Sequence, residues 1–352
     1  MTDLSLTLQQ NIIDAYENNR SLQIMGGNSK AFYGRTPSGE KLEISSNAGI
    51  ISYEPTELVI TARGGTPLHE IESALAGNNQ MLPFEPPHFG ESATLGGTIA
   101  CNLSGSRRPY AGSARDFVLG IKLLNGKGEI LSFGGEVMKN VAGYDISRLM
   151  CGALGTMGIL LEVSLKVLPK AEAEITLIKE LDEQTAIDAI AQHSRTSLPV
   201  SAALYDGARL YLRLCGTANS VVTAKQKMGG DELSDNDNFW HKINEHKHSF
   251  FDSTLPLWRL SLAPYTAQLD LKGKWMLDWG GAQRWLLSDE PADKIRSAAE
   301  QAGGHTSLFR NGERSQDIFH PLHPKMMELH NNLKNAFDPK GILNPGRMYK
   351  DL

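Results

Sequence analysis

The stretch that decides the fold is ATLGGTIACNLSGSRRPYAGSARDFVLGIKLLNGKGEILSFGGEVMKNVAGYDISRLMCGALGTMGILLEVSLKVLP, which spans residues 93–169. It is rich in glycine, since fourteen of the chain's 34 glycines lie between Gly90 and Gly158. A flexible linker pairs glycine with serine and few apolar residues, but here glycine alternates with leucine, isoleucine, valine and methionine. Because glycine at an ordered position costs conformational entropy, this dense use indicates a backbone that must approach another group closely.

The same stretch contains clear strand signals. Residues 116–124 and 128–133 read as two strands, and Asn125-Gly126 between them supplies the positive φ angles of a hairpin turn. Residues 159–167 alternate well enough for a further strand. The glycines of GALGTMG (152–158) run into that strand with the spacing G-x-x-G-x-x-G, so a Rossmann dinucleotide site is not expected there.

Two small-residue segments are candidates for close approach to a ligand. The first, 93–100, has paired glycines that would let a flat ligand lie against the backbone, or would equally allow tight strand packing. The second is Gly26-Gly27-Asn28-Ser29, which follows a predicted strand over 22–25. Successive backbone N–H groups in such a turn form an anion-binding concavity, although the same residues also suit an ordinary glycine turn.

The order of elements outside these segments separates two halves. The N-terminal half is expected to contain helices at 4–19 and 67–76 and strands at 49–53 and 58–62. After Pro169, strands and helices follow the order βαββα(β) twice, which is typical of two split-βαβ, ferredoxin-like halves. In this half, 267–271 is expected to be a short helix and 229–238 a mobile loop. A final helix at 324–337 is expected to turn inward Met326, Met327, Leu329, Leu333 and Phe337.

Composition limits the class of protein. The chain has 352 residues, of which 41% are hydrophobic, and its net charge is -5, from 35 basic and 40 acidic residues. Neither disorder nor nucleic-acid binding is expected from these values. The three cysteines, Cys101, Cys151 and Cys215, are too few and too scattered for a disulfide framework or a zinc site. The expected location is cytoplasmic, because no secretory signal or membrane-spanning stretch stands out.

Taken in order, the motifs carry a resemblance to a known family. The chain resembles the FAD-binding fold of the vanillyl-alcohol oxidase / p-cresol methylhydroxylase family, and within it the FAD-binding E subunits of bacterial glycolate oxidases. The matching stretches are MGGNSK (25–30), ITARGGTPLHEIESALAGNNQMLPFEPP (60–87), the 93–169 stretch and FDPKGILNPGRMY (337–349). The resemblance covers the FAD domain almost completely and is thinner over 175–320.

The resemblance implies an α+β fold with three parts. Residues 1–170 would form a p-cresol methylhydroxylase-type FAD-binding domain of two α/β subdomains. Residues 171–325 would form a ferredoxin-like α+β cap domain. Residues 326–352 would be a C-terminal helix and a tail that returns to the FAD domain.

The resemblance also implies which residues bind FAD. The turn at 26–29 would hold the diphosphate with its amides, and Tyr144 and Asp145 match a family "GYD", where Asp145 could equally cap a helix. The residues implied in FAD binding are Gly26, Gly27, Asn28, Ser29, Pro83, Thr94, Gly96, Gly97, Thr98, Ser104, Gly105, Gly158, Ile159 and Asn344.

Three points bear on the chemistry: the attachment of FAD, a possible metal site and the residues that could hold substrate. Some relatives attach FAD through a histidine after the paired glycines, but Asn28 stands there, so non-covalent FAD is expected. No metal site is expected, because His320 and His323 lack a matching acid. Weak candidates to hold a substrate carboxylate are Arg107, Arg108 and Arg259, and no residue is assigned as catalytic base.

The resemblance leads to three hypotheses about function. In the first, the chain is the FAD-binding subunit of a glycolate oxidase complex that oxidises glycolate to glyoxylate. It would work with a D-type flavin subunit and an iron–sulfur subunit, with peripheral inner-membrane association through the complex. In the second, it is a stand-alone FAD-dependent D-2-hydroxy-acid dehydrogenase. In the third, it is a structural subunit whose flavin is idle or absent.

Overall fold

The computed structural model describes residues 3–135 and 145–352 and divides into two compact units. The first unit contains residues 1–103, 113–169 and 314–352, and the second contains 104–112 and 170–313. These limits differ from the predicted domains in two places. Residues 104–112 belong with the second unit, although 1–170 was predicted as one domain, and 314–325 belong with the first.

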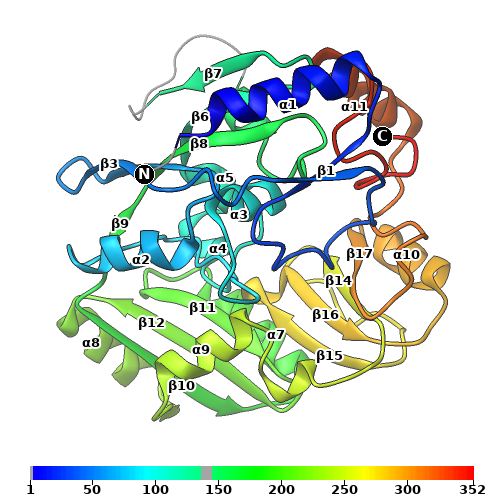
Figure 1. The fold of residues 1–352 in the computed structure, drawn as a ribbon. Coiled ribbons are helices and arrows are strands. Elements are labelled where there is room, and N and C mark those ends of the chain that lie inside the picture. Colours follow the sequence, from blue (N-terminus) through cyan, green and yellow to red (C-terminus); the bar gives the residue numbers. More distant parts are fainter. Residues whose placement is uncertain (1–2, 136–144) are drawn as a thin grey trace. The chain divides into compact units, whose positions relative to one another are not determined.

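The largest sheet of the first unit has five antiparallel strands in the order β3-β4-β8-β6-β7 (Figure 1). Their bounds are β3 Ile50–Glu54, β4 Val59–Arg63, β6 Val118–Leu124, β7 Ile130–Gly134 and β8 Ile159–Lys166. The predicted hairpin is confirmed by the pairing of β6 with β7. Its turn is held by Asn125, whose side chain accepts from the amides of Lys127 and Glu129. The central strand β8 is buried at most of its positions because it is covered on both faces.

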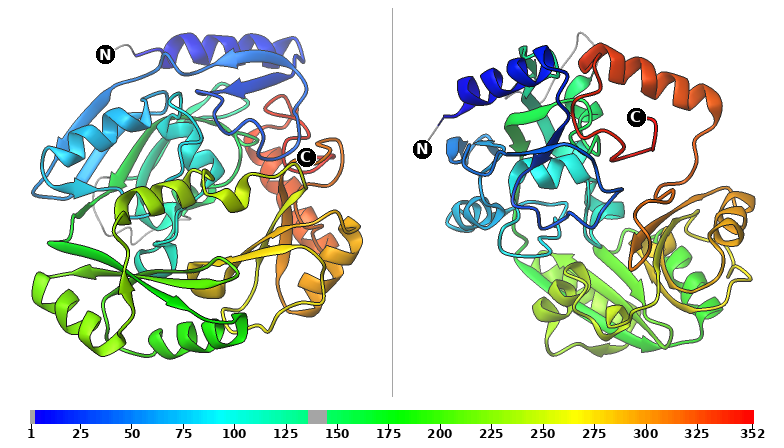
Figure 2. Two further views of the ribbon diagram at one scale, coloured as in Figure 1. Left: turned by 90° about the horizontal axis from the view of Figure 1, so that it is seen from below. Right: turned by 45° about the vertical axis from the view of Figure 1, so that its right-hand side comes forward.

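A second layer of the first unit is built on the parallel pair β1 (Leu22–Met25) and β2 (Glu40–Glu43). The helix α1 (Ser5–Glu17) buries Leu8, Ile12 and Ala15, which recur at the spacing of one helix face. These side chains share one hydrophobic cluster with both sheets and with residues near the C-terminus; the cluster is Leu8, Ile12, Ala15, Leu22, Leu42, Ile44, Leu124, Ile159, Leu161, Ile342 and Leu343. The two ends of the chain are therefore packed into a single core, and Figure 2 shows β1 beside the C-terminal loop.

Short elements connect these layers. They are α2 (Leu68–Ala76), β5 (Gln80–Met81), α3 (Leu95–Cys101), α5 (Ala114–Phe117), α6 (Ile146–Leu149), β9 (Leu168–Pro169) and α11 (Pro324–Phe337). The predicted inward packing of α11 is wrong for two residues, since Met326 is 46% and Leu329 54% exposed. The one buried residue of this helix is Lys334, which makes polar contacts described below. Asp145 caps α6 by accepting from the Arg148 amide, whereas Tyr144 lies outside the described residues.

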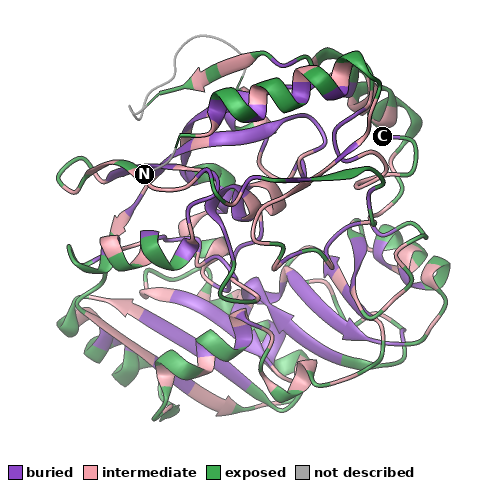
Figure 3. Cartoon of the chain, in the orientation of Figure 1, coloured by how far each residue is buried: buried purple, intermediate pink, exposed green. Residues whose placement is uncertain are grey.

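The second unit is one antiparallel sheet of eight strands in the order β13-β10-β12-β11-β15-β16-β14-β17. The strands β10 to β13 follow the order 4-1-3-2 of a ferredoxin-like half, and β14 to β17 repeat it in mirror image. The halves meet where Tyr205 of β11 pairs with Leu277 of β15. Figure 3 shows how much of this sheet is buried.

The elements of the second unit have the following bounds: α4 Arg108–Ala111, β10 Ala173–Glu180, α7 Glu183–His193, β11 Val200–Tyr205, β12 Arg209–Gly216, α8 Ala218–Met228, β13 Asp231–Glu232, α9 Asn236–Asn244, η1 Ser249–Phe251, β14 Leu257–Ser261, β15 Lys274–Asp278, η2 Trp279–Gly281, β16 Gln283–Leu287, α10 Ala292–Gln301 and β17 His305–Arg310.

Two local predictions for this unit are wrong. The segment 267–271 is irregular rather than helical, because the buried Arg284 takes the carbonyls of Thr266 and Ala267 as acceptors. A helix would need such carbonyls for its own amides. The predicted loop over 229–238 instead contains the short edge strand β13 and the first turn of α9.

Candidate functional site

An open pocket lies in the first unit, with about 790 Å³ of empty space that is partly continuous with solvent. Four segments form its wall: β1 and the turn after it, the first residues of α3, the glycine loop before β8, and the C-terminal loop. The segments come from both ends and the middle of the chain, so the pocket exists only when the first unit is folded.

The turn at 26–29 offers its backbone to this pocket. Asn28 has φ +58°, a left-handed conformation that asparagine tolerates better than most residues. Gly27 is pressed against the next segment, and a Cβ atom there would lie 1.4 Å from the Ser92 carbonyl oxygen. Within the residues that the structure describes, no protein atom accepts a hydrogen bond from the amides of residues 26–29. The turn therefore presents unpaired N–H donors, as an anion-binding concavity requires.

The wall beside this turn is the N-terminal part of α3, where the sequence did not predict a helix. Thr94 is its N-cap, and the Thr94 side chain accepts from the Gly97 amide at 3.3 Å. The helix packs so closely that a Cβ at Gly96 would lie 2.9 Å from the Gly64 carbonyl oxygen. A Cβ at Gly26 would lie 2.6 Å from the Thr94 hydroxyl. Gly96 and Gly26 therefore allow α3 to pack closely at the edge of the pocket.

Loss of the Thr94 cap gives a first test of this wall. We expect Thr94→Ala to lower the free energy of unfolding by about 1 kcal/mol, because one α3 amide loses its acceptor. Thr94→Ser keeps the hydroxyl and should stay close to the wild-type value. Urea unfolding of the full chain measures both, and a Thr94→Ala protein as stable as Thr94→Ser would contradict the capping role.

The C-terminal loop closes the pocket through Asn344. Leu343 pairs with Leu22 as an added parallel bridge beside β1. The Asn344 side chain is 4% exposed, accepts from the Ile24 amide at 2.7 Å and donates to the Leu154 carbonyl at 2.8 Å. Asn344 therefore ties β1 to the glycine loop, and it has a structural function besides lining the pocket.

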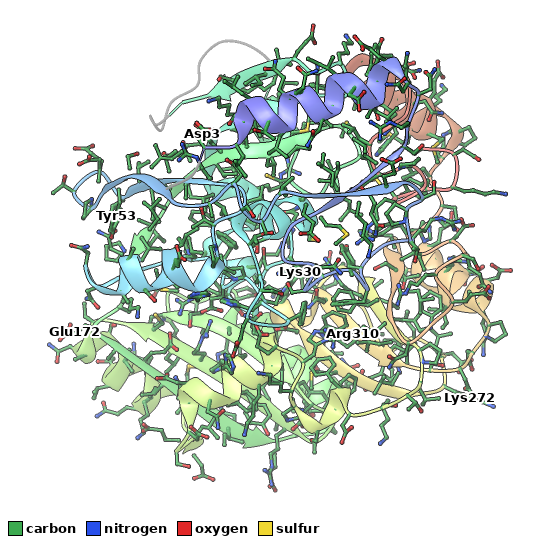
Figure 4. The ribbon with its side chains drawn as sticks, viewed as in Figure 1. Asp3, Lys30, Tyr53, Glu172, Lys272 and Arg310 are labelled. Carbon is green, nitrogen blue, oxygen red and sulfur yellow. The ribbon has the colours of Figure 1, made fainter. Side chains whose placement is uncertain are left out.

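Three chemically distinctive side chains of the pocket were not predicted from the sequence. Lys30, labelled in Figure 4, follows the turn directly and donates to the His88 carbonyl at 3.1 Å. Arg347 reaches the carbonyls of Lys30 and Ala31 at 3.4 and 3.3 Å. Cys101 ends α3, and burial raises the pKa of its thiol, although Lys30 and Arg347 act in the opposite direction. MGGNSK and NPGRM contained both cations, but nothing in the spacing showed that they meet.

Ten of the predicted residues line this pocket together; they are Gly26, Gly27, Asn28, Ser29, Thr94, Gly96, Gly97, Gly158, Ile159 and Asn344. Four others do not line it. Pro83 is buried elsewhere in the first unit, and Thr98 is fully buried with its hydroxyl unpaired among the described residues. Ser104 and Gly105 belong to the second unit.

The three candidate arginines lie in the second unit. Arg107 is ion-paired to Glu174 at 2.6 Å and also approaches the Cys215 sulfur at 3.2 Å. Arg108 and Arg259 both lie over the Trp279 ring, with guanidinium carbons 4.3 and 5.3 Å from its centroid. Arg107 is thus engaged in an ion pair, and Arg108 and Arg259 are engaged in cation–π contacts with one indole.

Metal-binding groups and membrane-spanning helices both bear on the class of protein. In residues 3–135 and 145–352, no group of three or more His, Cys, Asp or Glu side chains is arranged to hold a metal ion. His323 instead caps α11 by accepting from the Lys325 amide. None of the described helices combines the length and apolar character needed to cross a membrane.

Comparison with known proteins places this geometry in a family. A model of the FAD binding domain matches residues 7–134, and a model of the C-terminal domain of FAD linked oxidases matches residues 318–348. The glycolate oxidase subunit GlcE of Escherichia coli (strain K12) is 46% identical over 350 residues, or 99% of both chains. The glycolate oxidase subunit GlcD of Bacillus subtilis (strain 168) is 34% identical over 143 residues, which are 41% of this chain and 30% of that protein.

A solved structure supports the fold independently of close sequence similarity. Alkyldihydroxyacetonephosphate synthase matches with a TM-score of 0.68 over 96% of this chain and 74% of that one, at 14% identity. This likeness confirms the predicted p-cresol methylhydroxylase-type architecture and says nothing of the reaction. Because the GlcE relative is similar over nearly its whole length, the chain belongs to the family of FAD-linked oxidases, as a relative of the E subunit of glycolate oxidase.

Proposed function

We propose that this chain is the FAD-binding subunit of a glycolate oxidase complex, which oxidises glycolate to glyoxylate. The observation that carries the proposal is the pocket of the first unit, where unpaired amides at 26–29 lie among glycine-rich walls. Its support from relatives is the 46% identity to the GlcE subunit over 99% of the chain.

The residues of the pocket fit FAD. The amides of the 26–29 turn would hold the diphosphate, and Gly96, Gly97 and Gly158 line the same pocket, where the rest of the molecule would lie. Bound flavin would supply hydride acceptance at its ring, while the protein supplies binding and orientation. Asn28 stands where some relatives have an attaching histidine, so the proposed FAD is held without a covalent bond.

The second unit is proposed to contribute to substrate binding. Arg108 and Arg259 remain candidates for the carboxylate of a small 2-hydroxy acid, since both guanidinium groups are held over one indole. Arg107 is the weaker candidate because it is already paired with Glu174.

The proposed partners follow from the relatives and from the cysteine count. A D-type flavin subunit is proposed because GlcD and GlcE are both named as subunits of glycolate oxidase. An iron–sulfur cluster with Cys ligation needs four thiolates, and this sequence has three cysteines. An iron–sulfur partner would therefore carry the electrons onward, and a cytoplasmic location, with peripheral membrane association through the complex, is part of the proposal.

Flavin content and redox response test this function. We expect the purified full chain to be yellow and to release its flavin into the supernatant on acid precipitation. Glycolate should bleach the flavin absorbance only when the partner subunits are present. Bleaching of the single chain by glycolate would favour a stand-alone dehydrogenase. A colourless chain that takes up no added FAD would favour a structural subunit and contradict the proposal.

A further inference from the structure

We propose that Arg347 and Lys30 form a side-chain anion site for a diphosphate group, which adds two positive charges to the amides of the 26–29 turn. The ligand is named as the diphosphate of FAD because of the function proposed above, and the inference rests on it to that extent. The site itself is argued from the charges and contacts of the first unit.

The geometry brings two distant cations to one wall. Lys30 and Arg347 are 317 positions apart, yet the Arg347 guanidinium reaches the carbonyls of Lys30 and Ala31 at 3.4 and 3.3 Å. The carbonyl of Arg347 in turn accepts from the Arg35 amide at 2.9 Å. Both cations line the same pocket as the four amides. Both also act to lower the pKa of the Cys101 thiol at the end of α3, against the effect of its burial.

The burial of the Arg347 guanidinium favours binding of an anion beside it. Burial lowers the pKa of its guanidinium, and the one nearby group that acts the other way is the Cys101 thiol. No described residue pairs a carboxylate with Arg347, and its two contacts to carbonyls are long. A charged group withdrawn from water costs free energy unless an opposite charge meets it. Because the described residues supply no such negative charge to Arg347, the bound ligand is expected to supply it.

A diphosphate matches this arrangement better than a single carboxylate. Its two negative charges correspond to the two cations, and its oxygens can accept from several amides at once. Arginine forms a planar donor fork suited to phosphate oxygens, and lysine contributes a compact point charge. Lys30 follows Ser29 directly and lines the same pocket as the amides of the turn.

The experiment compares ligands with and without phosphate. The full chain is freed of flavin and titrated with FAD and with riboflavin, which lacks the diphosphate. Inorganic pyrophosphate is tested by its effect on the thermal unfolding midpoint. The variants are Arg347→Gln, Lys30→Gln, the double variant and Arg347→Lys. Arg35→Gln is the matched control, because Arg35 is near Arg347 in the fold but does not line the pocket.

Each loss of charge is expected to raise the Kd for FAD about 10- to 100-fold, the size of a charge-assisted hydrogen bond at 1.4 kcal/mol per tenfold change. The Kd for riboflavin should change less than about twofold, and Arg347→Lys should recover part of the FAD affinity. Pyrophosphate should stabilise the wild type and Arg35→Gln, but not the double variant. The Kd for FAD should also depend less on salt in the double variant.

The outcomes separate this inference from the proposed function. Wild-type FAD affinity in the double variant overturns the inference and leaves the function standing. Equal losses for FAD and riboflavin also overturn it, because they indicate a structural role. If pyrophosphate stabilises the wild type but not the double variant, while FAD does not bind at all, the anion site is supported and the proposed function fails.

Discussion

Gly27→Ala is expected to weaken FAD binding about 10- to 100-fold. The added Cβ would lie 1.4 Å from the Ser92 carbonyl oxygen and 3.1 Å from the Ser92 Cβ atom. The Ser92 hydroxyl also donates to the Gly27 carbonyl at 2.6 Å, so the two segments cannot separate without losing that bond. The turn must therefore move, and its amides lose the positions that the proposed diphosphate needs. Overpacking of this kind typically costs 1–3 kcal/mol, and each 1.4 kcal/mol is a factor of ten in affinity.

The control for this substitution is Gly77→Ala. Gly77 has a helical φ of -59°, and a Cβ there would meet no atom closer than 3.5 Å. Both variants are titrated with FAD by flavin fluorescence, and far-ultraviolet circular dichroism checks that each is folded. A folded Gly27→Ala protein that binds FAD like Gly77→Ala would show that the turn does not hold the cofactor.

Lys334→Met is expected to lower the free energy of unfolding by about 3–5 kcal/mol. The Lys334 side chain is 6% exposed, and its ammonium donates to the Thr156 carbonyl, to Asp338 and to the Leu343 carbonyl at 2.6–2.8 Å. Asp338 is completely buried and accepts from the amides of Ile342 and Leu343. Removal of the lysine leaves the Asp338 charge and two carbonyls without their donor. The free energy should be read from urea unfolding followed by fluorescence.

A double-mutant cycle separates the ion pair from the packing of the methylene groups. Lys334→Met with Asp338→Asn should cost less than the sum of the two single changes, since no unpaired buried charge remains. Lys340→Met is the control, because Lys340 carries the same charge in the loop that follows α11 but is exposed. Its loss should cost less than about 1 kcal/mol. Additive single changes would contradict direct coupling between the two side chains.

Elements with a strong local signal could be predicted from the sequence. The hairpin of β6 and β7 follows from Asn125-Gly126 between two apolar runs, and the structure has it. The twofold βαββα order likewise led to the two ferredoxin-like halves of the second unit. In both cases the periodicity of the side chains and the turn residues lie within one short window, so neighbours along the chain determine the result.

The errors share a different cause, which is dependence on distant residues. α3 contains Gly96 and Gly97, which disfavour a helix locally, and it forms where Gly96 packs against Gly64. The segment 267–271 lacks a helix because Arg284, from another strand, takes its carbonyls. Met326 and Leu329 follow a helical period, yet the face of α11 that packs is organised around Lys334.

The candidate site was likewise predicted only where the signal was local. The turn at 26–29 and the small residues of 93–100 stood out by composition, and the resemblance linked them. Nothing in the sequence singled out Lys30 or Arg347, and only the fold shows that they share one wall. Whether any of these residues contacts FAD stays a prediction.

The bridge between Leu22 and Leu343 has a consequence for biosynthesis. A ribosome makes β1 first, but the residues that complete its pocket, Asn344 and Arg347, emerge some 320 positions later. A nascent chain still held in the exit tunnel therefore cannot close the pocket around flavin. If FAD binds in this pocket as proposed, it is loaded after translation of this segment, and a product truncated before Asn344 would remain colourless.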